Sequence, residues 1–452
     1  MSGGGARQAS TFCGLMSISR RSIWIDCFTK VEELIGKAQI RLAKKIMSDN
    51  LQEEARLSPM NTEVNRKKVT LCMDGGWDQR ASGKAYNSAS GRVVSARGKT
   101  KKVCHLIYYS KRCSKCEAKK EHPTELCANP EKYDRSSKAM EALGSVQTVL
   151  NLWNNFSNLY CGAIVTDEDG TTRSKLSHSM QEQLDAKLIS EEDRRYPPTK
   201  EGCLGAKKSD LGELPLDHPK MDHLSDPLHY VKSYKTELYT LAYSKKAHSE
   251  TCKADAMRLS RNLAYMVAEC TPGTGQGELT FEKFQKAGEA SFEHHWNNHL
   301  HCGSWCQPKK WSAEEREKNK HKYRDKLKNP KEYAQQMKVK EKFLEPKRMW
   351  RMYHEYGNNK TEQIHGFVVN TFLPKRSYFC RTICGRARTN LAVSIDSLGY
   401  LQYYKLLYLA IGIEMSCINK LFFIQHDRTR DKDAVYCAHP EWRKQRGRQR
   451  LE

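Results

Sequence analysis

The sequence has no apolar run that approaches the ~20 residues needed to cross a bilayer as a helix. Its first residues, MSGGGARQASTF, lack the apolar stretch of a secretory signal peptide. It also lacks repeats with a period of roughly 20–50 residues, which argues against a solenoid or a propeller. These absences predict a soluble, intracellular protein that has no membrane partner.

Acidic residues are scarce relative to basic ones, because 53 Asp and Glu stand against 77 Lys and Arg, a formal net charge of +24. Such an excess favours a polyanionic partner, and nucleic acid is the first candidate. The 452 residues can bury a full core in one large or two smaller domains. In an intracellular chain, the 17 cysteines are more typical of metal ligands or free thiols than of disulfides.

The chain is organised around residues 66–77, RKKVTLCMDGGW. Apolar and polar side chains alternate over residues 69–73, which predicts a short β-strand. We expect this strand to end at Asp74, because Gly75 and Gly76 allow the chain to turn and a ligand to approach the backbone. A carboxylate at a strand tip can hold a hard metal ion, although Asp-Gly-Gly is also typical of a surface turn.

The order of the other expected elements suggests a fold. Residues 17–56 have helical periodicity, and strands are expected over 85–96 and 103–110. A helix opens at Ser136, and a strand over 159–166 stops at acidic residues. Three strands, a helix and a strand with terminal carboxylates is the order of an RNase H-like nuclease core. We therefore predict an α/β fold, an RNase H-like mixed sheet flanked by helices, with a helical insertion domain before the last catalytic helix.

Composition shifts along the chain predict five segments. In chain order, these are an N-terminal helical segment (1–65), the first part of the RNase H-like core with a zinc-knuckle-like loop (66–176), a loop-rich and helical insertion (177–350), the last part of the core with a helix that carries a catalytic Glu (351–425), and a basic, disordered tail (426–452).

Phosphodiester chemistry with two divalent ions ~3.5–4 Å apart needs carboxylates from different elements. Asp74 and Asp167 supply two of them from strand ends, and Asp169 is an alternative to Asp167. Glu362, on a late helix, is the best candidate for the third, although its sequence context also fits an ordinary exposed residue. Mg²⁺, or Mn²⁺ in its place, suits such all-oxygen ligands.

Two clusters of cysteine and histidine have the count and spacing of tetrahedral zinc sites. The first is Cys113-x2-Cys116-x5-His122-x4-Cys127, for which unliganded thiols in a loop are the alternative. The second could use His294 or His295 together with His299, Cys302 and Cys306. Asp226 and His229 form a weaker pair, since a helix-capping Asp is the default there.

Basic residues interleaved with aromatics could track phosphates and stack on bases, although a solvated helix face with buried Trp fits them equally well. Another basic pair follows the Glu362 helix, near the expected path of a DNA strand. These nucleic-acid-binding candidates are Lys309, Lys310, Lys347, Arg348, Lys375 and Arg376.

Seven short blocks in this order, over roughly residues 15–415, resemble the metazoan-type Mutator-like transposases. They are MDGGW (73–77), a Tyr-rich strand with Cys-x2-Cys (103–116), Ser-Ser-x-Ala-Met-Glu (136–141), Thr-Asp-x-Asp (166–169), Ser-Asp-x-x-His (225–229), the second His/Cys cluster (294–306), and Asn-x-x-Glu running into Leu-Pro-Lys (359–375).

The resemblance implies that Asp74, Asp167 and Glu362 form the catalytic triad of an RNase H-like DDE fold, with an insertion domain before Glu362. It also implies a nuclear protein that binds the terminal inverted repeats of its element and uses Mg²⁺ for strand cleavage and transfer. Zinc would then be structural. Two departures stand out: Asp226 replaces a Cys that is frequent in the family, and the chain begins almost at the catalytic core.

We therefore expect a Mg²⁺-dependent DDE-type DNA transposase of a Mutator-like element. The alternative is a domesticated, truncated or decayed copy that binds DNA without catalytic turnover. A zinc-knuckle RNA-binding protein is a more distant option. Self-association into a homo-oligomer is left open.

Overall fold

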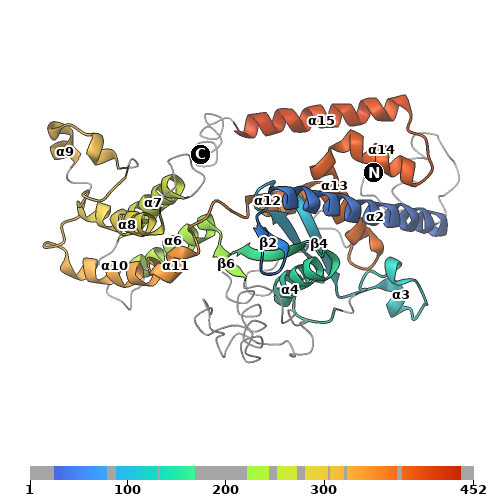
Figure 1. Ribbon diagram of the computed structural model, residues 1–452, viewed down its shortest axis with the longest axis horizontal. Helices are drawn as coiled ribbons and strands as arrows, with labels where there is room; N and C mark the ends of the chain where they lie inside the picture. The colour runs from blue at the N-terminus through green and yellow to red at the C-terminus, as the bar shows by residue number, and fades with distance from the viewer. Residues whose placement is uncertain are drawn as a thin grey trace.

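The computed structural model describes residues 25–78, 88–130, 133–167, 221–243, 252–271, 280–303, 306–319, 323–373 and 379–438. The candidates Asp169, Lys375 and Arg376, and most of the expected loop-rich stretch after residue 177, lie outside these ranges. Among the described helices, none is long and apolar enough to cross a membrane. The chain forms a sheet flanked by helices, with a lobe of helices beside it (Figure 1).

The sheet is mixed and has the strand order β4-β3-β2-β5-β6, with the short β1 paired to β2. β2, β3 and β4 run antiparallel, whereas β5 is parallel to β2 and β6 is parallel to β5. The predicted α/β class, with a mixed sheet flanked by helices, is therefore confirmed. The strands are β1 (Met60–Asn61), β2 (Arg66–Trp77), β3 (Ser90–Arg97), β4 (Val103–Ser110), β5 (Leu159–Thr166) and β6 (Asp222–Ser225).

The helices fall into two sets. Those near the sheet are α2 (Ile25–Leu57), α3 (Ser114–Glu117), η1 (Thr124–Leu126), α4 (Ser137–Asn155), α12 (Asn359–Phe367), η7 (Val368–Phe372), α13 (Ile383–Leu398), α14 (Tyr400–Ala410) and α15 (Cys417–Ala438). Those of the lobe are α6 (Pro227–Tyr243), α7 (Lys253–Cys270), α8 (Phe281–Glu293), η4 (His294–Trp296), η5 (Gln307–Lys310), α9 (Ala313–Asn319), α10 (Pro330–Phe343) and α11 (Pro346–Trp350).

Both faces of the sheet are covered, and the period of two along each strand decides which side chain faces which helix. In β3, Val93 packs with Met140 of α4, whereas its neighbour Val94 packs with Met47 of α2 and Ala392 of α13. Figure 1 shows α2 and α13 on one side of the sheet and α4 on the other. The core therefore has two layers of side chains, one on each face of the sheet.

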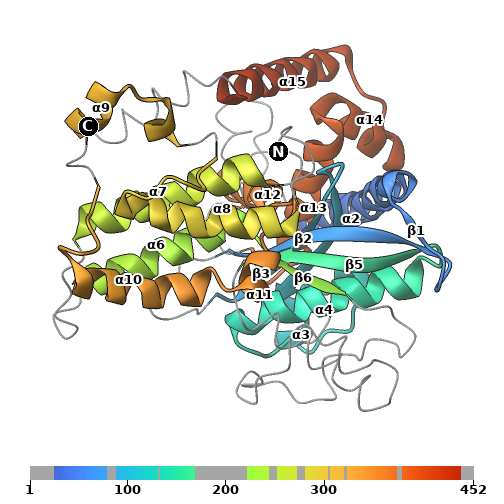
Figure 2. The ribbon, with the colours of Figure 1, turned by 60° about the vertical axis from the view of Figure 1, so that its left-hand side comes forward.

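The helical lobe has its own apolar core. Tyr230 and Tyr234 of α6, Leu263 of α7, Phe284 of α8 and Phe343 of α10 are all buried in one cluster. The lobe follows β6 directly through α6 and returns to the sheet region through α11 and α12 (Figures 1 and 2). The two ends of the lobe therefore meet at the edge of the sheet where β5 and β6 end.

Three local predictions were wrong. β2 does not end at Asp74 but continues to Trp77, paired with β3. Residues 222–225, within the segment expected to be loop-rich and helical, form β6, because they pair with β5. The basic tail, expected to be disordered from residue 426, is helical to Ala438, because α15 packs on α14 through Phe423 and Tyr404.

Candidate active site and metal clusters

The register of β2 and β5 places Asp74 beside Asp167. The last paired residues of these parallel strands are Cys72 and Val165, and each Asp lies two residues further along its own strand. Two residues is one full period of a strand, so both carboxylates leave the sheet on the same face. The sheet thus brings together two acidic residues that are far apart in the sequence.

The glycines after Asp74 permit close approach rather than a turn. A β-carbon at Gly75 would lie 2.8 Å from Oε2 of Glu141 in α4, and one at Gly76 would collide with the imidazole of His365 in α12. Helices from opposite faces of the sheet therefore contact β2 directly at these two positions. The absence of side chains here lets α12, the helix that carries Glu362, lie against Asp74.

Glu362 reaches the site through His229. The imidazole lies between two carboxylates, with Nδ1 3.0 Å from Oδ2 of Asp167 and Nε2 2.8 Å from Oε1 of Glu362. The side chains of Asp167, His229 and Glu362 are 32%, 25% and 51% exposed, whereas that of Asp74 is only 17% exposed. The group is therefore open to solvent on the Glu362 side and closed at Asp74.

Asp226 positions these groups without joining them. Its Oδ1 accepts hydrogen bonds from the backbone N–H groups of Leu228 (2.7 Å) and His229 (3.2 Å), as a helix N-cap does. Its Oδ2 accepts from the backbone N–H of Asn358, just before α12. Both oxygens are therefore used in linking α6 to α12, the arrangement of a capping Asp rather than of a metal ligand.

The concentration of negative charge changes the proton affinities. Burial and the nearby charges of Asp167 and Glu362 raise the pKa of Asp74 to about 7. Burial also raises the pKa of Asp167, against the opposing effects of His229 and Asn358. For His229, burial opposes charging, but the hydrogen bond to Glu362 and the charge of Asp167 raise its pKa. The negative charges of the three carboxylates repel one another, so a bound cation would stabilise their ionised forms.

A buried polar chain behind Asp74 fixes β2 relative to α12. The Nε–H of Arg92 donates to Nδ1 of His365 (3.1 Å), so Nε2 carries the proton that is donated to the carbonyl oxygen of Asp74 (3.1 Å). Arg92 also pairs with the buried Asp78, which accepts a 2.8 Å hydrogen bond from the hydroxyl of Tyr108. Because His365 and Glu362 are three residues apart on α12, this chain also orients Glu362.

Sequence reasoning missed Arg92, Asn358 and His365. Asn358 donates from its amide to Oδ1 of Asp167 (3.3 Å), whereas His229 contacts Oδ2, so the two residues hold different oxygens of that carboxylate. The only signal for His365 was its spacing of three residues from Glu362, and Arg92 lies in a strand with no local motif. Their roles depend on contacts between distant elements.

The first Cys/His cluster has its four ligand atoms within 4.8 Å of one another. Nε2 of His122 lies 3.7 Å from the sulfur atoms of both Cys113 and Cys116, and Cys116 lies 3.6 Å from Cys127. A tetrahedral zinc ion would space such atoms by about 3.5–3.8 Å. Nδ1 of His122 is 2.8 Å from the carbonyl oxygen of Lys120, which leaves Nε2 unprotonated for a metal.

The second cluster uses His294, His299, Cys302 and Cys306, again within 4.8 Å. Nδ1 of His294 is 3.0 Å from Nδ1 of His299, 3.4 Å from Sγ of Cys302 and 3.6 Å from Sγ of Cys306. One ring nitrogen cannot satisfy three such partners with a single hydrogen, whereas one shared metal ion can. Both clusters could therefore hold zinc.

The alternative ligand His295 lies outside that cluster. It is buried and faces Asp255 and Glu332, and these three residues form another group whose ligand atoms lie within 4.8 Å of one another. The guanidinium of Arg324 already lies 2.6 Å from Asp255 and 4.0 Å from Glu332. We therefore interpret this group as a buried ion-pair network that anchors α7, η4 and α10.

Asp74, Asp167 and Glu362 are not among the groups of described residues whose ligand atoms meet that 4.8 Å spacing. His229 holds Asp167 and Glu362 apart in this state, since it occupies the space between them. The donor set still fits a hard divalent ion, because all three side chains are carboxylates. Burial and the charges of Asp167 and Glu362 raise the pKa of Asp74, and a bound cation would offset those charges.

The basic candidates differ in how available they are. Lys310 and Lys347 are exposed, whereas Nζ of Lys309 lies 3.3 Å from the carbonyl oxygen of Leu300 and also donates to that of Cys302. The guanidinium of Arg348 lies 4.3 Å from the ring centroid of Phe343. Lys310 and Lys347 are therefore the better placed of these four for contacts with a phosphate backbone.

The fold and the site thus define a mixed α/β protein with clustered acidic residues at the ends of parallel strands and two Cys/His clusters. Comparison with protein families gives a match of residues 1–194 to the Mutator-like transposase model. The resemblance predicted from the sequence is confirmed for this part of the chain, which contains Asp74, Asp167 and the first Cys/His cluster. No curated protein and no solved structure matches the chain.

Proposed function

We propose that this protein is a DNA transposase that cleaves and transfers strands at the cluster formed by Asp74, Asp167 and Glu362. The observation that carries the proposal is their convergence: β2 and β5 place two carboxylates side by side, and α12 brings the third to His229. The family match of residues 1–194 supports chemistry on DNA. It ends before α12, so the role of Glu362 rests on geometry.

The strand order supports an RNase H-like core. Three antiparallel strands, β2 to β4, are followed by α4 and by β5, which returns parallel to β2. In open α/β sheets, ligands bind outside the carboxyl ends of parallel strands. Asp74, Asp167 and Asp226 lie at that edge, and the lobe between α6 and α11 stands where the insertion domain is expected.

Mg²⁺, or Mn²⁺ in its place, bound by oxygens of Asp74, Asp167 and Glu362, would polarise the scissile phosphate and lower the pKa of the attacking water or 3′-hydroxyl. Asp74 must lose its proton before it can act as a ligand. Because its pKa is raised to about 7, the carboxyl is only partly ionised near neutral pH. His229, when charged, donates from Nδ1 to Asp167 and from Nε2 to Glu362, so it offsets part of their charge while no cation is bound.

The rest of the chain serves binding and positioning. The net charge of +24 supplies affinity for DNA that should fall steeply with added salt. Lys310 and Lys347 are exposed contacts for the phosphate backbone. Both zinc ions would be structural, since each Cys/His cluster offers four protein ligands and leaves no open position. The action on terminal inverted repeats and the nuclear location belong to this proposal through the family.

The test is Mg²⁺-dependent nicking of a supercoiled plasmid by the wild type and by Asp74→Asn and Glu362→Gln. Glu355→Gln is the matched control, because Glu355 is an exposed carboxylate close in sequence to α12. We expect nicking by the wild type and the control only, with plasmid binding retained by all four proteins. Tight binding without nicking by the wild type would instead favour the silent DNA-binding alternative, and nicking by both cluster variants would exclude these carboxylates.

A further inference from the structure

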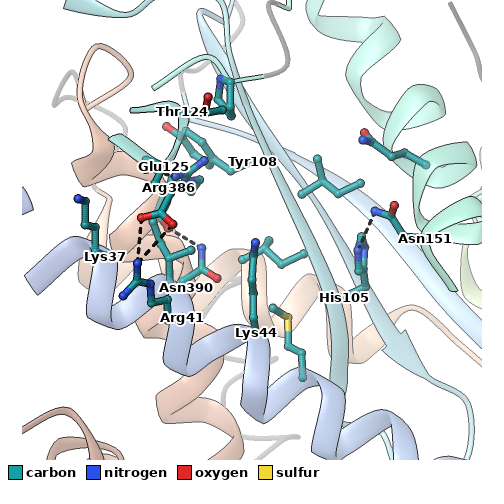
Figure 3. Close-up of a pocket in the computed structure, with 16 residues that line it drawn as sticks. Lys37, Arg41, Lys44, His105, Tyr108, Thr124, Glu125, Asn151, Arg386 and Asn390 are labelled. Carbon is teal, nitrogen blue, oxygen red and sulfur yellow. Dashed lines mark hydrogen bonds and ion pairs between the residues drawn. The ribbon is translucent and has the colours of Figure 1, made fainter. Parts of the chain in front are cut away.

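A cavity of about 390 Å³ opens at the outer edge of the sheet, where β4 is the last strand (Figure 3). It lies between α2, α4 and α13, with residues 105–108 of β4 as its floor. Its lining includes none of Asp74, Asp167, His229 and Glu362. The cavity is therefore a separate site, of the volume usual for small-molecule pockets.

Four cations lie in its polar lining. Lys37, Arg41 and Lys44 lie on one face of α2, and Arg386 comes from α13. Glu125 is the acidic residue of the lining, and Arg41 holds it at 3.1 Å. Figure 3 shows Lys44 pointing from α2 into the space between Asn390 and His105. Lys37 and Lys44 make no hydrogen bond or ion pair with any described residue.

The opposite wall is polar and uncharged. Burial of His105, together with the nearby positive charge of Lys44, lowers the pKa of its imidazole to about 4, so this ring is neutral at physiological pH. The hydroxyl of Thr148 donates to Gly144, so its oxygen accepts from Nδ1 of His105 (3.0 Å). Nε2 of His105 then accepts from the amide of Asn151 (3.3 Å), which leaves Oδ1 and one N–H of Asn151 for a ligand.

An apolar recess of about 130 Å³ adjoins the cavity and shares Lys44, Met47 and Asn151 with it. Leu51, Leu152 and Phe156 line the recess but not the cavity. A ligand that fills both spaces would therefore meet cations, amide groups and apolar side chains in turn. These surroundings suit a phosphate joined to a group that is both apolar and able to hydrogen-bond, as a nucleotide base is.

The first Cys/His cluster builds one wall of the cavity. Thr124 and Glu125 lie between the ligands His122 and Cys127 in the sequence, and both line the cavity. Arg386 donates to the carbonyl oxygen of Glu125, which ties this loop to α13. A metal ion in the cluster would therefore fix the cavity's shape.

We propose that this cavity binds a nucleotide unit, with its phosphate on Lys37 and Lys44 and its base against Asn151 and the apolar recess. This nucleotide unit is either an unpaired nucleotide of a DNA strand or a free nucleoside monophosphate. Lys and Arg neutralise phosphates, and amide side chains offer the donor and acceptor that a base edge requires. The site goes beyond the proposed strand cleavage, because it shares no residue with the carboxylates and needs no Mg²⁺.

The test is fluorescence anisotropy with a labelled single-stranded oligonucleotide, for the full chain in a buffer without added divalent metal and without chelator, so that zinc is retained. Lys37→Gln/Lys44→Gln removes the two cations that would bind phosphate. Lys331→Gln/Lys338→Gln is the matched control, since these exposed lysines on α10 have the same spacing of seven residues. A third variant, Thr124→Trp, fills the cavity mouth without changing the charge.

We expect the pocket variant to bind roughly ten-fold more weakly than the wild type. Its salt slope should fall by about 0.7, because the two lysines neutralise one phosphate, and each neutralised phosphate of a single strand accounts for ~0.7 of the slope. The control pair should stay within about two-fold of the wild type. Thr124→Trp should weaken binding and lower the salt slope by a similar amount, because a blocked cavity loses the same phosphate contact although no cation is removed.

Unlabelled competitors of the oligonucleotide then distinguish a free nucleotide from a nucleotide within a strand, and a nucleic acid from an acidic peptide. Displacement of the oligonucleotide by dAMP supports a site for a single nucleotide, and displacement by unlabelled oligonucleotide alone supports a nucleotide within a strand. Equal binding by the two lysine pairs would overturn the proposal. Displacement by poly-glutamate but not by either nucleic acid ligand would also overturn it, in favour of an acidic peptide. Neither result depends on nicking, so failure of the proposed catalysis remains distinguishable.

Discussion

The two Cys/His clusters and the carboxylate cluster are assembled in opposite ways. Each Cys/His cluster comes from one short stretch, 113–127 or 294–306, and its ligand atoms already lie within 4.8 Å of one another. The carboxylates come from positions 74, 167 and 362, and His229 separates two of them. The first arrangement is closed and suits a structural ion, whereas the second leaves room for exchange of ion and substrate.

The second Cys/His cluster and the carboxylate cluster are also stabilised by different kinds of contact. The second Cys/His cluster borders the core of the lobe, because Cys302 and Cys306 are buried with Phe284 and Trp296. The carboxylate cluster instead depends on buried polar contacts, from Tyr108 through Asp78 and Arg92 to His365. Loss of a ligand should therefore lower the stability of the fold at the second Cys/His cluster, whereas at the carboxylate cluster it should change the chemistry.

The largest expected effect is loss of a ligand in the second Cys/His cluster. Cys306→Ser should remove one zinc ion per chain and lower the melting temperature by about 10 °C or more, since structural zinc contributes its binding free energy to folding. Cys116→Ser in the first, more exposed cluster should cost less, and the exposed Cys417→Ser should change neither quantity. Zinc content and thermal unfolding measure this, and an unchanged zinc content in Cys306→Ser would contradict the assignment.

The next effect is a pH dependence of stability in protein free of divalent metal other than zinc. The pKa of Asp74 is raised from 3.8 to about 7, so the folded state favours the protonated form. Its contribution to the free energy of unfolding is full below pH ~4 and is lost as the pH rises through about 7, by up to about 4 kcal/mol.

The measurement is denaturant unfolding from pH 5 to 8. The stability of the wild type should fall relative to Asp74→Asn over this range, and added Mg²⁺ should restore it at pH 8. The raised pKa of His229 acts in the same direction in both proteins, so their difference isolates Asp74. Parallel pH profiles for the two proteins would show that the Asp74 carboxyl is not buried among other acidic groups.

A smaller effect should follow Gly76→Ala. The new β-carbon would meet the ring of His365, so we expect a loss of about 1–3 kcal/mol in the free energy of unfolding. Gly366→Ala is the control, because a β-carbon there meets nothing within 4 Å, and this variant should be slightly stabilised. Partial rescue of Gly76→Ala by His365→Ala would locate the strain, and equal stability of the two alanine variants would refute it.

The smallest effect tests the capping role of Asp226. Asp226→Asn keeps an acceptor for the backbone N–H groups of Leu228 and His229 but turns an amide NH2 toward the backbone N–H of Asn358, so it should cost about 1 kcal/mol. Asp226→Ala should cost about 1–2 kcal/mol. Neither variant should change the number of divalent ions bound, as measured by isothermal titration. A lost ion in Asp226→Asn would mean that Asp226 is a ligand after all.

The sequence allowed the acidic residues and both Cys/His clusters to be named, because short motifs carry them. It did not predict that β2 passes through Asp74, since Asp-Gly-Gly is typical of turns and the reason for the glycines lies in Glu141 and His365 on other helices. β6 was missed because Asp222–Ser225 has little apolar character and exists through its pairing with β5.

The same limit applies to the candidate site. The choice between His294 and His295 could not be made from spacing, because both are buried neighbours whose rings face different elements. Arg92 and His365 were missed because they act across the sheet and helix α12, far apart in the chain. Local pattern thus predicts which residues carry the chemistry, and tertiary contacts decide how they are held.

The most direct test of the central claim is to count Mn²⁺ ions bound to the zinc-loaded full chain at pH 8 by electron paramagnetic resonance. Mn²⁺ is a probe for the same hard-ligand site as Mg²⁺. The account predicts saturable binding by the wild type and by the Glu355→Gln control, and loss of that binding in Asp74→Asn. If the wild type binds Mn²⁺ no more tightly than Asp74→Asn does, the carboxylates do not form a metal site.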